Sequence, residues 1–138
     1  MTTTTKQVLH PTLRYRDAHA AIDWLERALG FERRTVHTDD DGNVVHAELD
    51  FRGGLVMLGS ARNPTEGGFQ EIAPPPGSSS VYVVIDDPDA LHDRAVAAGG
   101  GEIVRELVDL DYGSRDFAVR DPEGNLWNFG TYDPWEAA

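Results

Sequence analysis

Three side chains in this sequence could together do metal or acid–base chemistry, namely His10, His46 and Glu48. His46 and Glu48 are two residues apart in a predicted strand, so both point to one face of it, and His10 could reach them from a neighbouring strand. Two histidines and one carboxylate form the ligand set of non-haem iron sites. Alternatively, His46 and Glu48 hydrogen-bond to each other or line a pocket without a metal. We favour this second interpretation because metal ligation demands a stricter geometry.

Arg115, Tyr82 and Tyr112 are the other candidates for contact with a ligand. Arg115 follows a glycine-containing turn and could clamp a carboxylate or carbonyl of a ligand, or it could pair with one of the many acidic residues nearby. Both interpretations stay open for this arginine. Either tyrosine could stack on a planar ligand, although packing in the core is the interpretation we favour for each one alone.

The chain is strongly acidic, with a formal net charge of −12 over 138 residues. Residues 1–69 contribute −2 of this charge and residues 70–138 contribute −10. Such a field repels phosphate backbones and anionic lipids, so neither nucleic acid nor a membrane is an expected partner. The chain has no cysteine, which excludes disulfides, zinc ribbons and thiol nucleophiles. No apolar run is long enough to span a membrane, and we expect a cytoplasmic protein.

The order of predicted elements occurs twice along the chain, as expected of an internal duplication. Each copy reads as a strand, a helix and three strands, judged from the spacing of apolar residues. Asp17 and Asp87, which precede the two predicted helices, are 70 residues apart, and so are the helix-ending glycines Gly30 and Gly100. The predicted parts of this single domain (1–138) are module one (8–60), a proline-rich linker (61–79) and module two (80–134).

Two βαβββ modules predict an α+β fold in which a mixed sheet curls into a half-barrel trough, with the helices on its outer face. Strand alternation separates the helix side from the trough side. In the third strand, for example, Ala47, Leu49 and Phe51 should face the helix. A trough lined by polar and aromatic groups suits a small-molecule site. The same alternation predicts Leu9, Leu13, Tyr15, Val81, Val83, Trp127 and Phe129 on the helix side, and His10, Thr12, Arg14, His46, Glu48, Asp50, Ser80, Tyr82, Val84 and Asn128 in the trough.

Three segments carry a resemblance to a known superfamily, namely VLHPTLRYRDAHAAIDWLERALGF, YVVIDDPDALHDRAVAAGG and YGSRDFAVRDPEGNLWNFG. They resemble the glyoxalase, bleomycin-resistance and extradiol-dioxygenase superfamily, also called the vicinal oxygen chelate superfamily, over about residues 8–134. The YG-x-R and W-x-F pattern at the end is similar to that of an uncharacterised bacterial branch. The resemblance implies a homodimer that completes its sites across two subunits, but it does not specify a ligand or a reaction.

The resemblance also implies where a metal would be held, because metal-dependent members place ligands on the first and last strand of each half. In this sequence those positions are His10, Met57, Ser80 and Asn128. His10 alone is a strong ligand, because a thioether, a hydroxyl and an amide bind Fe²⁺, Ni²⁺ or Zn²⁺ weakly. We therefore expect no cofactor, with a divalent metal on His10, His46 and Glu48 as the alternative.

The function that we expect is metal-independent binding of a small organic molecule, of the sequestering or resistance type. The alternative is a lyase, isomerase or dioxygenase that acts on a small carbonyl substrate, with or without a divalent metal. In a metal-free enzyme, Glu48 would be the general base with a pKa raised by partial burial, and Arg115 or His10 would stabilise the enolate. A third interpretation is an interaction module with a filled trough. The candidate ligand-binding residues are His10, His46, Glu48, Ser80, Tyr82, Tyr112, Arg115 and Asn128, of which Glu48 and Arg115 are the catalytic candidates.

Overall fold

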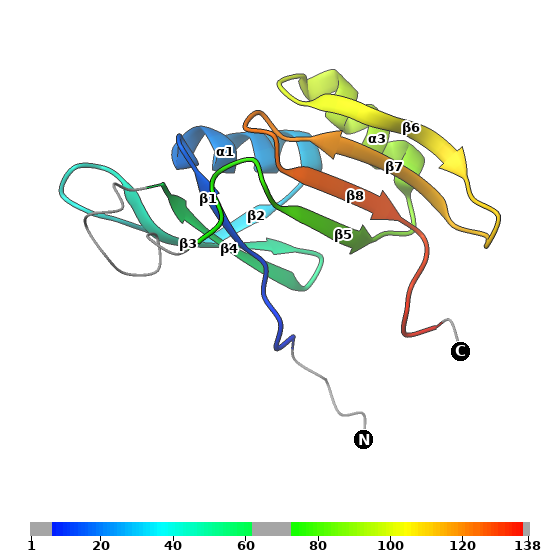
Figure 1. Ribbon diagram of the computed structural model, residues 1–138, viewed down its shortest axis with the longest axis horizontal. Coiled ribbons are helices and arrows are strands. Elements are labelled where there is room, and N and C mark those ends of the chain that lie inside the picture. The colour runs from blue at the N-terminus through cyan, green and yellow to red at the C-terminus, as the bar shows by residue number, and fades with distance from the viewer. Residues whose placement is uncertain (1–6, 62–72, 137–138) are drawn as a thin grey trace.

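The computed structural model describes residues 7–61 and 73–136, and it contains the predicted order of elements twice (Figure 1). Much of the predicted linker 61–79 therefore lies outside the described residues. The first copy consists of β1 (Thr12–Tyr15), α1 (Ala18–Trp24), the π-helical turn η1 (Leu25–Leu29), β2 (Glu32–Thr38), β3 (Val44–Phe51) and β4 (Gly54–Ser60). The second copy consists of β5 (Ser80–Val84), α3 (Pro88–Ala98), β6 (Glu102–Asp109), β7 (Arg115–Arg120) and β8 (Leu126–Gly130).

The strands form two mixed sheets of the same topology, with strand orders β1-β4-β3-β2 and β5-β8-β7-β6. The first strand of each module runs parallel to the last strand of that module, β1 to β4 and β5 to β8. The remaining neighbouring strands are antiparallel. This repetition confirms the α+β fold class predicted from the duplicated sequence. Within the described ranges, β1 and β5 are edge strands and do not pair with each other, so the strands form two separate four-stranded sheets and not one continuous sheet.

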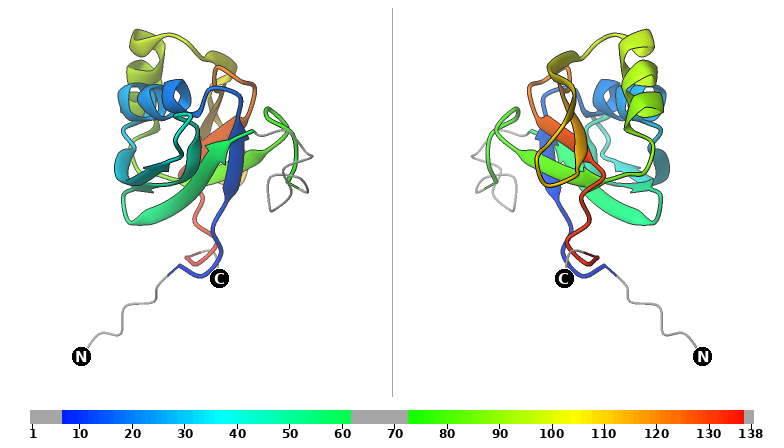
Figure 2. Two further views of the ribbon diagram at one scale, coloured as in Figure 1. Left: turned by 90° about the vertical axis from the view of Figure 1, so that its left-hand side faces the viewer. Right: turned by 90° about the vertical axis from the view of Figure 1, so that its right-hand side faces the viewer.

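Both helices lie on the same side of the sheets, which leaves the opposite face uncovered by helices (Figure 2). The α1 helix begins where the Asp17 carboxylate accepts a hydrogen bond from the Ala20 amide at 3.0 Å. It continues through η1 to Gly30, which has the left-handed conformation with φ 81°. Asp87 precedes α3, but its carboxylate binds the Arg52 guanidinium instead of an amide of the helix. No helix of the described parts is long and apolar enough to cross a bilayer.

The hydrophobic core is shared by the two modules. Phe31 packs edge-on against Trp127 with ring centroids 5.3 Å apart, and Phe51 lies 6.0 Å from Phe129. Trp127 and Phe129 have no solvent exposure. Each of these pairs joins one module to the other, so the two modules share one hydrophobic core.

A buried polar cluster also joins the modules at the turn between β7 and β8. The Asp121 carboxylate accepts hydrogen bonds from the Tyr15 hydroxyl at 2.6 Å and from the Trp127 indole at 3.1 Å. In the same turn, the Glu123 carboxylate accepts the backbone amides of Arg16 and Asp17 at 2.6 and 2.8 Å. Burial, together with the negative charge of Asp121, raises the pKa of Tyr15 far above its ordinary value, so this phenol stays protonated.

The alternation predicted for the strands is confirmed in β3, where Ala47 and Leu49 are fully buried while His46 and Glu48 are half-buried on the other face. The prediction for Leu9 is wrong, because this side chain is 83% exposed. The first strand begins only at Thr12, so the preceding segment is not part of the sheet and does not pack under a helix.

Candidate functional site

The helix-free face of the first sheet carries the polar residues that the sequence predicts there. Thr12 on β1 pairs with Met57 on β4, which in turn pairs with Glu48 on β3, so the three side chains form one row across the sheet. His46 lies two residues before Glu48 on the same face. A hollow of about 290 Å³ opens on this face, lined by Thr12, Leu13, Val45, His46, Met57, Leu58 and Gly59. We call this space the first-sheet hollow.

His46 and Glu48 are hydrogen-bonded to each other, with 2.9 Å between Nε2 and Oε2. This is the pairing that the metal-free interpretation of the sequence predicted. The hydrogen bond from His46 lowers the pKa of Glu48 below its ordinary value, and the positive charge of Arg34, whose Nε lies 3.7 Å from Oε1, acts in the same direction. The expectation that burial raises this pKa is therefore wrong, because the hydrogen bond outweighs the small desolvation.

His10 does not join this pair. It precedes β1, and its Nδ1 lies 3.0 Å from the backbone carbonyl oxygen of Leu55. Within residues 7–61 and 73–136, no three His, Asp or Glu side chains are arranged to hold a metal ion. The set of His10, His46 and Glu48 considered from the sequence is thus not assembled as a ligand set by this fold.

The helix-free face of the second sheet brings Tyr82 and Asn128 together, because they are register partners on the parallel strands β5 and β8. The side-chain oxygen Oδ1 of Asn128 is buried and has no hydrogen-bond partner among the described residues. A buried acceptor without a partner is costly, so this oxygen is available to a donor on a ligand or to a water molecule. Ser80 is exposed at the start of β5, on the same face as Tyr82.

Tyr82 and Tyr112 are not core residues, contrary to the interpretation favoured from sequence. Their exposed fractions are 39% and 65%. The Tyr82 hydroxyl donates a hydrogen bond of 2.7 Å to the carbonyl oxygen of Tyr132. The Tyr112 ring packs edge-on against the Tyr132 ring at 5.7 Å. The three rings leave part of their area open to solvent beside β8, where a ligand could stack on them.

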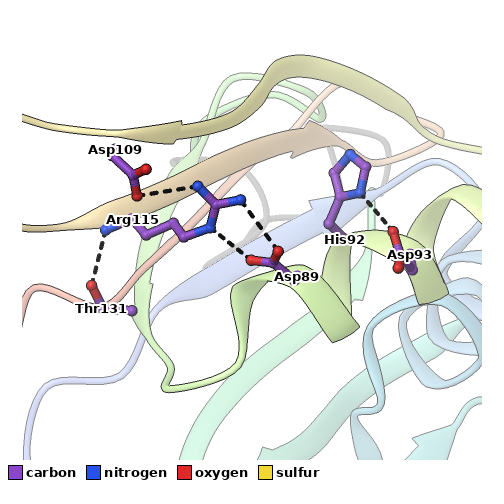
Figure 3. Close-up of polar contacts among 6 residues, drawn as sticks. All are labelled: Asp89, His92, Asp93, Asp109, Arg115 and Thr131. Carbon is purple, nitrogen blue, oxygen red and sulfur yellow. Dashed lines mark hydrogen bonds and ion pairs between the residues drawn. The ribbon is translucent and has the colours of Figure 1, made fainter.

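Arg115 lies on the helix side and not over the trough (Figure 3). Its Nε and Nη2 atoms donate to the two oxygens of Asp89 on α3 at 2.7 and 3.2 Å, and Nη1 donates to Asp109 at 3.1 Å. These two carboxylates raise the pKa of Arg115 further above its ordinary value. Of the two interpretations left open, the ion pair is therefore the one that the fold contains, and Arg115 does not belong to the candidate site.

The family model for the Glyoxalase/Bleomycin resistance protein/Dioxygenase superfamily matches residues 7–129, which is nearly the whole described chain. The protein belongs to this superfamily. The strand order, the duplicated modules and the helix-free face are thus those of a glyoxalase-like domain, as the sequence segments predicted.

Several relatives of this superfamily member are known. An uncharacterised protein of Mycobacterium tuberculosis is 30% identical over 131 residues, which cover 88% of this chain and 72% of that protein. The crystal structure of TioX from Micromonospora sp. ML1 is similar, with 35% identity, a TM-score of 0.72 and coverage of 88% of this chain and 97% of TioX. A bleomycin-binding protein from Streptomyces verticillus, complexed with copper(II)-bleomycin, has 22% identity, a TM-score of 0.66, and coverage of 96% of this chain and 100% of that protein. The last likeness concerns the fold alone.

The glyoxalase-like domain also contains candidate residues that the sequence did not reveal, namely Asp116, Gly130 and Tyr132. Asp116 precedes the apolar run Phe117–Val119, and both faces of β7 are buried, so no alternation marks this aspartate as special. Tyr132 follows the last strand. The sequence places Tyr112 and Tyr132 20 residues apart, and this separation does not show that their rings meet.

Proposed function

We propose that this glyoxalase-like protein binds a small organic molecule on the helix-free face of its two sheets without the help of a metal ion. The observation that carries the proposal is the first-sheet hollow, in which Thr12, His46 and Met57 surround a space of about 290 Å³. A concave site with an apolar floor and a few polar groups is typical of small-ligand pockets. A protein of similar fold is complexed with copper(II)-bleomycin, so this fold is able to accommodate an organic ligand.

The pairing of Glu48 with His46 favours binding over proton abstraction. A general base works best when its pKa is near the operating pH, whereas the hydrogen bond from His46 holds the pKa of Glu48 below its ordinary value. A carboxylate already bonded to an imidazole is suited to orient a ligand that offers a donor to its free lone pairs. The homodimer implied by the family resemblance stays a prediction.

A substitution that fills the first-sheet hollow should abolish ligand binding. Thr12 is exposed on β1, so Thr12→Trp places an indole over Met57 with little cost to folding. In a thermal-shift screen of small aromatic and cationic compounds, a ligand at 100 times its Kd stabilises the folded protein by about 2.7 kcal/mol. We expect this stabilisation in the wild type and its loss in T12W.

The matched control is Thr38→Trp, which adds the same indole at an exposed position of β2 that does not line the hollow. T38W should keep the full ligand-induced shift in melting temperature. Equal shifts in T12W and the wild type would place the ligand elsewhere and contradict the proposed site.

Metal removal should change neither stability nor ligand binding. We expect elemental mass spectrometry to find well under one iron, zinc, nickel or manganese ion per chain in protein purified without a nickel column. Dialysis against EDTA should leave the melting temperature and the ligand shift unchanged, because in the proposed site side chains hold the ligand without a metal. A stoichiometric metal that is lost in His46→Ala would overturn the metal-independent proposal and support metal-assisted chemistry at this face.

A further inference from the structure

Tyr82, Tyr112 and Tyr132 form a partly exposed aromatic surface at one end of the second sheet. We call these three residues the tyrosine cluster. Tyr82 is fixed by the hydrogen bond from its hydroxyl to the Tyr132 carbonyl, and Tyr112 is perpendicular to Tyr132, with an angle of 86° between the ring planes. Exposed fractions of 39%, 65% and 40% leave ring area open on each member. The open face of an aromatic ring carries the negative end of the ring quadrupole.

A buried carboxylate lies beside the tyrosine cluster. Asp116 on β7 is only 2% exposed, and its side chain accepts a hydrogen bond from the Ser114 hydroxyl. In the described ranges, no lysine, arginine or histidine forms an ion pair with it; the neighbouring Arg115 binds Asp89 and Asp109 on the other face. A buried carboxylate whose partner is a neutral hydroxyl lacks the cationic partner that buried carboxylates ordinarily have.

Gly130 is the residue that lets the carboxylate and the tyrosine come together. It lies on β8, between β5 and β7 (Figure 1), and it is the register partner of both Val84 and Asp116. A Cβ atom added there would collide with the Asp116 carboxylate and would lie 2.7 Å from the Tyr82 hydroxyl oxygen. The phenol of Tyr82 and the carboxylate of Asp116 therefore share the space that a side chain at position 130 would fill.

This arrangement attracts positive charge for two reasons that add together. The ring faces attract a cation through their quadrupoles, and the Asp116 carboxylate, which has no ion-pair partner among the described residues, is suited to be its counter-ion. The pKa of Tyr82 is raised, chiefly by burial and also by the charge of Asp116, so the phenol keeps its proton and its hydrogen bond to Tyr132. Asn128 is the register partner of Tyr82 on β8, and its buried Oδ1 is positioned to accept a hydrogen bond from an N–H group of the same ligand.

We propose that the tyrosine cluster and Asp116 form a subsite for an organic cation, such as the alkylammonium group of a larger ligand. The inference rests on the proposed binding function, because it names the chemical class that one part of the ligand must have. The net charge of −10 on residues 70–138 supports the same preference by steering cations toward this half of the chain.

The test compares choline with 3,3-dimethylbutan-1-ol, which has the same shape but no charge. Each compound is titrated into the full-length protein, and its Kd is obtained from the shifts of the assigned tyrosine ring signals in NMR spectra. We expect choline to bind about three- to tenfold more tightly than the neutral alcohol. Asp116→Asn keeps an acceptor for Ser114 but removes the charge, so it should lose most of this preference.

The matched control is Asp40→Asn, which removes the same charge from an exposed turn of the other module and should keep the full preference for choline. If D116N does not fold, Tyr112→Ala provides a second test, because this exposed ring can be removed with little effect on the core and choline should then bind less tightly. Equal affinities of the two compounds for the wild type, an unchanged preference in D116N, or an unchanged choline affinity in Y112A would each overturn the inference. The proposed function would still stand if neutral ligands gave thermal shifts that T12W abolishes.

Discussion

Replacing Asp121 with alanine is expected to lower the free energy of unfolding by about 4 kcal/mol, because buried hydrogen-bond donors are left without an acceptor. Asp121 is 4% exposed, and its Oδ2 accepts from Tyr15 and Trp127. Its Oδ1 accepts the backbone amides of Glu123 and Asn125 at 3.0 Å each. Tyr15 and Trp127 are fully buried, so bulk solvent does not contact the two ring donors in the folded protein. Urea denaturation of D121A and the wild type measures the difference.

A turn with the same D-x-x-G-N pattern supplies a matched control for D121A. Asp39 begins this turn, between β2 and β3, and its Oδ1 accepts the amides of Asp41 and Asn43 at 3.0 Å each. This turn is largely exposed, so water can replace the lost acceptor. We expect Asp39→Ala to cost about 1 kcal/mol, as for other local side-chain to backbone bonds. Equal losses in D39A and D121A would mean that the ring donors contribute nothing and that the turn alone matters.

The fold was predictable from sequence because local and long-range signals agree. The aspartates before the helices and the glycines after them recur at a spacing of 70 residues, and this repetition fixes the order of elements. In β3, the strict alternation from Ala47 to Phe51 indicated which face is buried. The same alternation put His46 and Glu48 on one face, where they meet as predicted.

The candidate site was less predictable where alternation is absent. In β7, Asp116, Phe117, Ala118 and Val119 are all buried, so the sequence pattern does not tell which side Arg115 faces. Its partner Asp89 lies on α3, 26 residues away, and only the packing of the helix on the sheet brings the two charges together. Opposite charges are too common in this chain for such a pair to be chosen from sequence.

The direction of the pKa shift of a site residue could not be predicted from the sequence either. Burial and hydrogen bonding shift the pKa of a carboxylic acid in opposite directions, and the balance depends on distances that a sequence does not contain. For Glu48 the contact with His46 decides the direction, and its pKa is lowered. For Asp116 the sequence shows only an aspartate in an apolar strand. Its position beside Tyr82 is possible because Gly130 has no side chain to occupy the space between them.

Gly101 is the position where the smallest possible addition should have a large effect on stability. A Cβ atom at this residue would lie 2.5 Å from Cζ2 of Trp24 and 2.7 Å from the carbonyl oxygen of Arg120. Neither neighbour can move easily: Trp24 is buried, its indole donates to Gly99 at 2.8 Å, and Arg120 belongs to β7. We therefore expect Gly101→Ala to lower the free energy of unfolding by about 3 kcal/mol, the upper end of the range for overpacking.

The control for this prediction is Gly99→Ala, two residues away in the same glycine run. Gly99 has φ 68°, and nothing lies within 4 Å of an added Cβ, so the substitution there tests backbone strain without a steric collision. A cost of about 1 kcal/mol is expected for G99A. Urea denaturation separates the two causes: a larger loss in G101A than in G99A shows that contact with Trp24 and β7 dominates. If G99A were the more damaging change, the conformation of the glycine run, and not its packing against the first module, would explain why glycines stand here.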